Sequence, residues 1–212
     1  MLHLIRWGMF FGGLCLLGMG NALAVKVKFL GLHPWEVLNV ALFQEIGLTI
    51  GSWSIITGLF LVLITYIVDR KYISLGTFLN AMCVGVIMDF FLWSGLLPES
   101  SGTWIDYFIL LAGILLAGIG GGLYVASNLG AGPRDGFMLI VSERTGISVS
   151  RARILVESII LIFGFLLGGP VFIATFIYTF IQSPVFQKSR TLFSGLLEKW
   201  IERRSMTSAI QK

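Results

Sequence analysis

The residues best suited to binding chemistry stand in two short segments that repeat one another along the chain. Pro133, Arg134 and Asp135 form one segment, and Pro34 and Glu36 hold the matching positions in the other, with tryptophan in place of arginine. A proline followed two residues later by an acid is typical of a helix start, because the carboxylate complements the positive helix end. Two such starts on opposite faces would also present backbone N–H groups to an anionic ligand, strengthened by the guanidinium fork. The segments therefore predict either helix starts alone or a ligand site built from them.

Ionisable residues inside apolar runs form a second group of candidates. Glu157 lies within such a run, and Arg153 stands four residues earlier on the same helical face. This spacing predicts either an intrahelical ion pair or a proton or substrate relay, since a charge in hydrocarbon usually faces protein or water. Asp89 and Asn80 share another apolar run and are further candidates.

The sequence contains none of the residue patterns that would indicate an enzyme. There is no Ser-His-acid set, no cluster of His or Cys, and no phosphate-binding glycine loop followed by Lys-Ser or Lys-Thr. His3 and His33 are isolated and are expected to be solvated or interfacial, and Cys15 and Cys83 both fall in apolar segments. We therefore expect no catalytic activity, no cofactor and no metal site.

The composition places the chain among integral membrane proteins. Hydrophobic residues make up 56% of the 212 residues and charged residues 12%, with a mean hydropathy of +0.90. Charged residues make up about 25% of a typical soluble domain. The bilayer is thus the expected partner, and the net charge of +4 reports orientation rather than nucleic-acid binding.

Six apolar segments are long enough for helices that cross a bilayer. The segment that begins at Trp7 imitates a cleavable signal peptide, but its match to the mid-chain segment 107–125 favours a retained helix. Two further apolar segments, 36–46 and the one beginning at residue 137, are too short to cross. The expected crossings are 7–26, 53–68, 74–93, 104–126, 151–167 and 171–186.

The repeated segments divide the chain into two related halves. The match extends from Gly31 and Gly130 to Gly76-Thr77-Phe78 and Ala174-Thr175-Phe176. Three crossings in each half would insert the halves in opposite directions, the inverted repeat common in secondary transporters. The predicted fold is thus all-α, with six transmembrane helices as a 3+3 inverted repeat. If the short helices crossed too, the halves would instead form a parallel repeat of four plus four.

The predicted units are a first membrane repeat over 1–103, a second over 104–187, and a cytoplasmic tail over 188–212. Apart from Lys26 and Lys28, all lysines and arginines fall on one predicted side, so both termini are expected in the cytoplasm. Leu192, Leu196 and Trp200 share one helical stripe of the tail, which predicts an amphipathic helix in the membrane interface. A docking surface for a cytoplasmic partner is the alternative.

With these segments in view, the chain resembles the YczE-like group of bacterial membrane proteins, which is related to YitT and YyaS. The resemblance covers roughly residues 8–187, with Ala174 in place of a usual glycine and Glu36 in place of a usual aspartate. It implies a multi-pass protein of a bacterial plasma membrane and no particular substrate. The glycines and prolines that carry it are Gly31, Pro34, Gly130, Gly132, Pro133 and Gly136.

The leading functional hypothesis is a small secondary transporter or permease-like protein for a small-molecule or anionic substrate. The alternative is a non-transporting accessory protein that acts through a cytoplasmic partner; a homo-oligomer fits either hypothesis. The expected ligand-binding residues are Trp35, Glu36, Asn80, Asp89, Arg134, Asp135, Arg153 and Glu157.

The predicted topology can be tested with single cysteines. A cysteine at Ser148 should react with a membrane-impermeant maleimide only from the cytoplasmic side, and one at Ser52 only from outside, because an inverted repeat places matching positions on opposite sides. Labelling in intact and permeabilised cells, with Cys15 and Cys83 replaced by alanine, makes the comparison. Reaction of both cysteines from the same side would contradict the inverted repeat.

Overall fold

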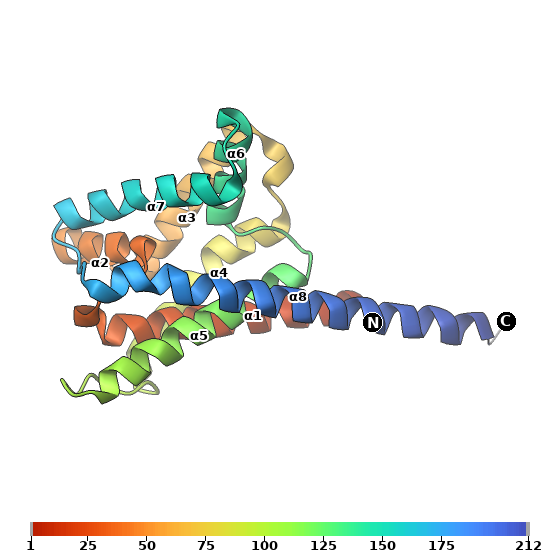
Figure 1. Cartoon of the computed structure of the whole chain (residues 1–212), viewed down its shortest axis with the longest axis horizontal. Helices are drawn as coiled ribbons and strands as arrows, with labels where there is room; N and C mark the ends of the chain where they lie inside the picture. Colours follow the sequence, from red (N-terminus) through yellow and green to blue (C-terminus); the bar gives the residue numbers. More distant parts are fainter. Residues whose placement is uncertain (1, 211–212) are drawn as a thin grey trace.

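The computed structural model describes the backbone of residues 2–210 and the side chains of residues 2–203, and this part of the chain is helical with no strand. Figure 1 shows the helices in chain order. The all-helical class predicted from the sequence is confirmed. The α-helices are α1 (Leu2–Lys26), α2 (Pro34–Ile46), α3 (Ile50–Val68), α4 (Leu75–Trp93), α5 (Ile105–Ala126), α6 (Pro133–Thr145), α7 (Val149–Leu166) and α8 (Ile173–Ile210), with 3-10 turns η1 (Lys28–Leu30) and η2 (Arg70–Tyr72).

Four helices in the described part of the chain are long and apolar enough to cross a membrane, namely α1, α3, α4 and α5. Helix α7 has 18 residues, but Arg151, Arg153 and Glu157 make it more polar than these four. Helix α8 runs on from an apolar start into a charged segment. The expected crossings by α7 and α8 therefore stay a prediction.

Helices α2 and α6 are short, as the sequence predicted. Each has 13 residues and begins with its proline in the first turn. At 1.5 Å per residue such a helix is about 20 Å long, less than the ~30 Å of a hydrocarbon core. Each ends at a glycine with positive φ, 88° at Gly47 and 72° at Gly146, a conformation that favours glycine. Turn chemistry thus sets both helix lengths.

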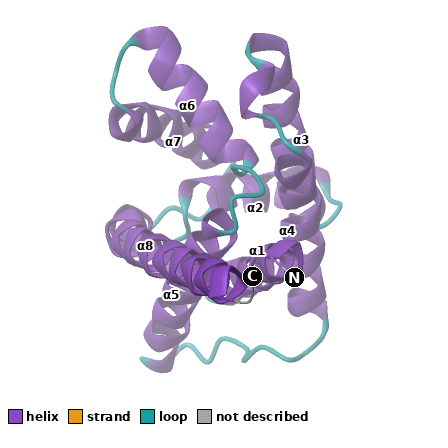
Figure 2. Cartoon of the chain, turned by 90° about the vertical axis from the view of Figure 1, so that its right-hand side faces the viewer, coloured by secondary structure: helices purple, strands orange, loops and turns teal. Residues whose placement is uncertain are grey.

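The helices form two groups that meet along α3 and α4 (Figure 2). In one group α1 packs against α4 and α5, and α5 also packs against α8. In the other, α2 and α6 each pack against both α3 and α7. Each short helix thus contacts one long helix of its own half of the sequence and one of the other half. The contact between α3 and α4 has no counterpart of similar extent between α7 and α8 within the described residues.

Glycines allow α1 and α5 to cross with their backbones nearly touching. A Cβ atom added to Gly120 of α5 would lie 2.6 Å from the carbonyl oxygen of Gly13, and one added to Gly20 of α1 would lie 2.6 Å from that of Gly113. Such small residues are typical of helix contacts in membranes, where packing rather than water exclusion holds helices together.

The C-terminal segment differs from the sequence prediction. A separate amphipathic helix was expected after residue 187, but α8 continues without a break from Ile173 to Ile210. Pro184 lies inside this helix and does not end it, since neighbouring groups in membrane proteins can satisfy the backbone carbonyl that a proline leaves unbonded. Figure 1 shows the far part of α8 extending beyond the other helices, at the end of the molecule where α1 begins.

The glycine crossing generates a stability prediction. Gly120→Ala should lower the stability of the protein in detergent by about 1–3 kcal/mol, because the added methyl group meets backbone atoms of α1 that cannot rotate away. Gly12→Ala is the matched control, since a Cβ atom there has nothing within 4 Å. Thermal unfolding of the purified variants would measure both, and equal stability of the two would contradict the close crossing.

Candidate functional site

A polar cavity lies where the first turns of α2 and α6 meet, inside the helical assembly. Its volume is about 120 Å³, and all eight α-helices contribute lining residues. Six of the eight predicted ligand-binding residues line it: Trp35, Asn80, Arg134, Asp135, Arg153 and Glu157. Glu36 lies directly behind this lining, in contact with Arg134. The two repeated segments therefore lie together at this cavity, and their binding of a ligand stays a prediction.

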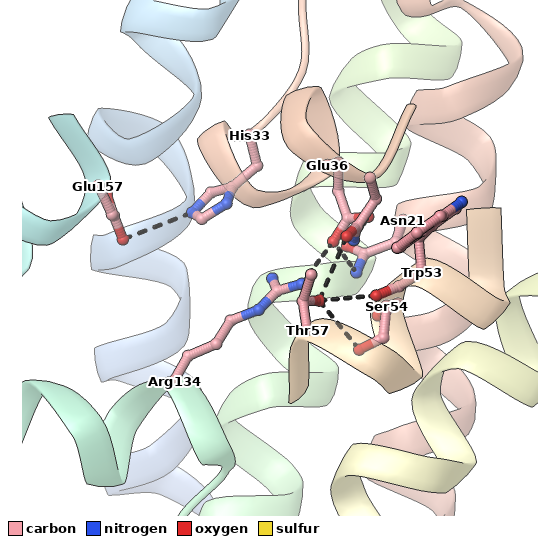
Figure 3. Close-up of polar contacts among 9 residues, drawn as sticks. Asn21, His33, Glu36, Trp53, Ser54, Thr57, Arg134 and Glu157 are labelled. Carbon is pink, nitrogen blue, oxygen red and sulfur yellow. Dashed lines mark hydrogen bonds and ion pairs between the residues drawn. The ribbon is translucent and has the colours of Figure 1, made fainter. Parts of the chain in front are cut away.

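Glu36 and Arg134 form an ion pair that joins the two short helices. Arg134 Nη2 donates to Glu36 Oε1 at 3.0 Å, and the Glu36 side chain is only 1% exposed (Figure 3). Asn21 Nδ2 donates to the same oxygen at 3.3 Å, and Asn39 Nδ2 donates to Oε2 at 3.1 Å. The guanidinium carbon also lies 5.1 Å from the Trp35 ring centre, within cation–π range. Both carboxylate oxygens of Glu36 are thus satisfied.

Asp135 is held in the same way by groups from two other helices. Tyr124 Oη donates to Asp135 Oδ2 at 3.0 Å, and Arg153 Nη2 donates to Oδ1 at 3.2 Å. The sequence allowed an intrahelical pair of Arg153 with Glu157. In the structure Arg153 pairs with Asp135 on α6 and not with Glu157 on its own helix.

Glu157 faces His33 across the cavity. The distance from Glu157 Oε1 to His33 Nε2 is 3.6 Å, and the two side chains are 10% and 13% exposed. The Tyr178 ring stands edge-on to the imidazole at 5.5 Å. The expectation that His33 is solvated or interfacial is therefore wrong. The loop before α2 turns inward, and this places the imidazole in the protein interior.

Asn80 and Asp89, both on α4, have different surroundings. Asn80 lines the cavity, and its buried Nδ2 has no hydrogen-bond partner among the described residues. Asp89 lies away from the cavity at the start of α3, where Oδ1 accepts from Gly51 N at 2.8 Å and Oδ2 accepts from the Thr49 hydroxyl. Asp89 thus caps a helix, and its place gives no support to the predicted ligand contact.

The signature glycines lie where each half of the chain contacts the other. Gly31, with φ of 116°, packs against Thr175 at the start of α8, whose hydroxyl accepts from Leu32 N at 3.2 Å. Gly130, with φ of 149°, packs against Ser74, whose hydroxyl donates to Leu129 O at 3.0 Å. A loop of the first half thus contacts the start of α8 in the second half, and the matching loop of the second half contacts the start of α4 in the first half.

Two further signature glycines differ in what they require. A Cβ atom added to Gly132 would lie 2.6 Å from Tyr124 Oη and 3.4 Å from Asn80 Oδ1, so glycine keeps this side of the cavity open. At Gly136 the nearest atoms would be 3.7 Å away, which is ordinary van der Waals contact. Gly136 is therefore not required by space.

Three site residues escaped the sequence reasoning: Asn21, Asn39 and Tyr124. Their side chains bind the carboxylates of Glu36 and Asp135 from α1, α2 and α5. Asn21 and Asn39 are polar residues in apolar runs. Charged residues in such runs usually face protein or water, and the same reasoning applied to asparagine would have identified these two. Tyr124 has no such signal, because tyrosine is common in membrane helices.

Comparison with known proteins agrees with the resemblance seen in the sequence. Residues 4–190 match the model of a family of unknown function, DUF6198. The chain is 35% identical to the uncharacterized membrane protein YczE of Bacillus subtilis over 95% of its own length and 93% of the relative's. It is 32% identical to an uncharacterized protein of Haemophilus influenzae over 78% and 74%, and 27% identical to YyaS of B. subtilis over 79% and 84%. No solved structure matches the chain.

The buried ion pair generates a coupling prediction. Arg134→Met should destabilise the protein by about 3–5 kcal/mol, because it leaves the Glu36 carboxylate buried without its cation. The double variant Arg134→Met/Glu36→Gln should recover part of this loss, since no buried charge then remains. Thermal unfolding of the four proteins in detergent closes the cycle, and additive effects would contradict the coupling.

Lys71→Met is the control for the Arg134→Met variant, because it removes the cation of an exposed ion pair. Lys71 Nζ donates to Glu143 Oε2 at 2.7 Å on the exposed side of α6, which holds the pKa of Glu143 below its ordinary value. The loss of such an exposed pair should change the stability little.

Proposed function

We propose that this chain, which belongs to the family of unknown function DUF6198 and is a YczE-like membrane protein, is a small secondary transporter. Its solute site is the polar cavity between the first turns of α2 and α6. In this proposal the protein is not an enzyme, it crosses a bacterial plasma membrane six times, and both termini lie in the cytoplasm. The observation that carries the proposal is that ionisable side chains of both halves converge on one cavity.

The charged residues of α7 are compatible with a membrane crossing. Glu157 is buried and faces His33, while Arg153 pairs with Asp135. Arg153 and Glu157 are thus turned to the cavity, as expected for charges inside a membrane protein, whereas Arg151 is exposed in the first turn of the helix. Large apolar side chains cover the outer faces of α7 and α8, where they would contact lipid: Ile162, Phe165, Leu166, Ile173, Phe176 and Phe180.

The reciprocal contacts between the halves support an inverted repeat. The Gly31 loop packs against the start of α8, and the Gly130 loop packs against the start of α4. The same exchange occurs among the helices, since α2 packs against α7 and α6 against α3. In transporters with inverted repeats, short or interrupted helices of the two halves meet around the substrate near mid-membrane. Helices α2 and α6 have the short length expected for that role, and their first turns meet at the cavity.

The cavity contains groups that could couple a proton to solute movement. Among the residues with described side chains, Glu157 forms no ion pair with a lysine or arginine, and its neighbour His33 lies at 3.6 Å. Carboxylates and histidines placed this way inside membrane proteins are typical of proton relays. A transporter alternates between a state open to the outside and a state open to the cytoplasm. We infer that protonation of the Glu157–His33 pair changes the balance between these two states.

An accessory role is the second candidate, and the length of α8 favours it. The far part of this helix extends beyond the other helices (Figure 1), and Leu192 and Leu196 on it are 59% and 54% exposed. A cytoplasmic protein could dock along this stripe. The two candidates differ in what they require, because an accessory protein needs the stripe and does not need an occupied cavity.

The transporter proposal is tested by uptake into liposomes that contain the purified protein. The external solution holds a defined mixture of small carboxylates, amines, amino acids and neutral amides, and the internal solutes are measured by mass spectrometry. Wild-type protein should accumulate at least one solute above protein-free liposomes. Arg134→Lys and Glu157→Gln should each reduce this uptake about tenfold or more, because the first loses the guanidinium fork and the second loses the proton carrier.

Lys71→Gln is the matched control for these variants, since it removes a charge outside the cavity and should transport as wild type does. Folded wild-type protein that accumulates none of the solutes would contradict the transporter proposal and favour the accessory role. Full uptake by both cavity variants would contradict the proposed site.

A further inference from the structure

Two carboxylates at the cavity, Glu36 and Asp135, have little remaining capacity to bind a ligand. Glu36 accepts from Asn21 and Arg134 at one oxygen and from Asn39 at the other. Asp135 accepts from Arg153 at one oxygen and from Tyr124 at the other. All four oxygens of these two carboxylates are therefore engaged within the protein, and a solute that donates hydrogen bonds to them would have to displace one of these partners.

Several hydrogen-bond donors at the cavity, in contrast, have no acceptor within the described residues. Trp35 and Asn80 line the cavity and are 2% and 7% exposed, and Trp35 Nε1 and Asn80 Nδ2 have no hydrogen-bond partner in the part of the chain that the structure describes. Buried donors without a partner are rare in native proteins, because the lost hydrogen bond to water is not replaced. Arg134 and Arg153 each use Nη2 in an ion pair, while a guanidinium carries five N–H groups. The cavity is thus prepared for a group that accepts hydrogen bonds.

The charges around the cavity favour the same kind of ligand. Arg134 balances Glu36 and Arg153 balances Asp135, so these four residues add no net charge. The N-termini of α2 and α6 each add a partial positive charge of about half a unit. Glu157 remains, and its charge is cancelled when the Glu157–His33 pair holds a proton.

We propose that the cavity binds a small anion through its oxygen atoms, either a carboxylate or an inorganic oxyanion. Trp35 Nε1, Asn80 Nδ2 and the guanidinium groups are the donors. A cavity volume of about 120 Å³ limits the ligand to a small anion. This inference names the solute class of the transporter proposed above, and it rests on that proposal only for the movement of the anion across the membrane.

Anion binding in this cavity is linked to proton uptake by the pair of Glu157 and His33. The groups around the pair are Arg153 on the same helix, Arg134 and Asp135 on α6, and the Tyr178 ring on α8. An anion near Glu157 favours the protonated pair, and by reciprocity a proton on the pair favours the anion. Anion affinity therefore rises as the pH falls.

Thermal unfolding of the full-length protein in detergent, at constant ionic strength, tests the inference with defined probes. Acetate, formate and nitrate are the anions, acetamide is the neutral molecule of acetate shape, and methylammonium is the small cation. Acetate or another of the anions should raise the unfolding temperature saturably, and more at lower pH, whereas acetamide and methylammonium should not. Trp35→Phe and Asn80→Leu should each weaken anion affinity about tenfold, the effect of one lost hydrogen bond to a charge.

Trp53→Phe is the matched control. It also deletes an indole N–H, but that group donates to Gly47 O at 2.8 Å and does not line the cavity. Its anion affinity should equal that of wild type. Glu157→Gln should bind the anion at high pH as wild type does at low pH.

The outcomes separate this inference from the transporter proposal. Stabilisation by methylammonium instead of the anions, no saturable effect of any anion, or unchanged affinity in both Trp35→Phe and Asn80→Leu would overturn the anion site. Anion binding in detergent without uptake into liposomes would leave the anion site in place and overturn the transporter. Uptake of an amine without anion binding would leave the transporter proposal in place and overturn the anion site.

Discussion

The Glu36 carboxylate, almost completely buried, constrains much of the surrounding structure. A buried charge is costly unless a counter-charge and hydrogen bonds surround it, and here these come from α1, α2 and α6. The requirement fixes the first turn of α6 against the first turn of α2. It also holds Arg134 above the Trp35 ring, which sets one wall of the cavity. The cavity is therefore a consequence of how one acid is neutralised.

Close backbone contacts allow the other helices to surround this pair. The glycine crossing of α1 and α5 brings Asn21 on α1 and Tyr124 on α5 towards the first turns of α2 and α6. Gly132 leaves room beside Tyr124 Oη and Asn80 where any side chain would intrude. Small residues thus have two functions in this protein, since they bring helices together and they leave a polar space between them. In a membrane both effects depend on packing, because lipid offers helices no hydrophobic drive to associate.

The sequence predicted the elements better than their partners. Pro34 and Pro133 marked the starts of α2 and α6, because helix-start preferences are local, and the short apolar segments after them indicated short helices. The partners of Arg134, Arg153 and His33 could not be predicted, since each lies on a different element and depends on how the halves pack. Asp89 was assigned to the site on its charge alone, and its role as a cap depends on the position of α3. The break expected after residue 187 failed because Pro184 was followed by residues that continue a helix.

The Gly31 and Gly130 loops each pack against the other half of the chain, and this has a consequence for biogenesis. The ribosome delivers Glu36 to the membrane long before Arg134, and the Gly31 loop long before Thr175, so the first half is inserted with its most costly group unpaired and its loop unsupported. Neither half has the contacts to reach its final form by itself. Maturation must therefore await the last helix, and until then Asn21 and Asn39 are the only described partners that the nascent first half offers to the Glu36 side chain.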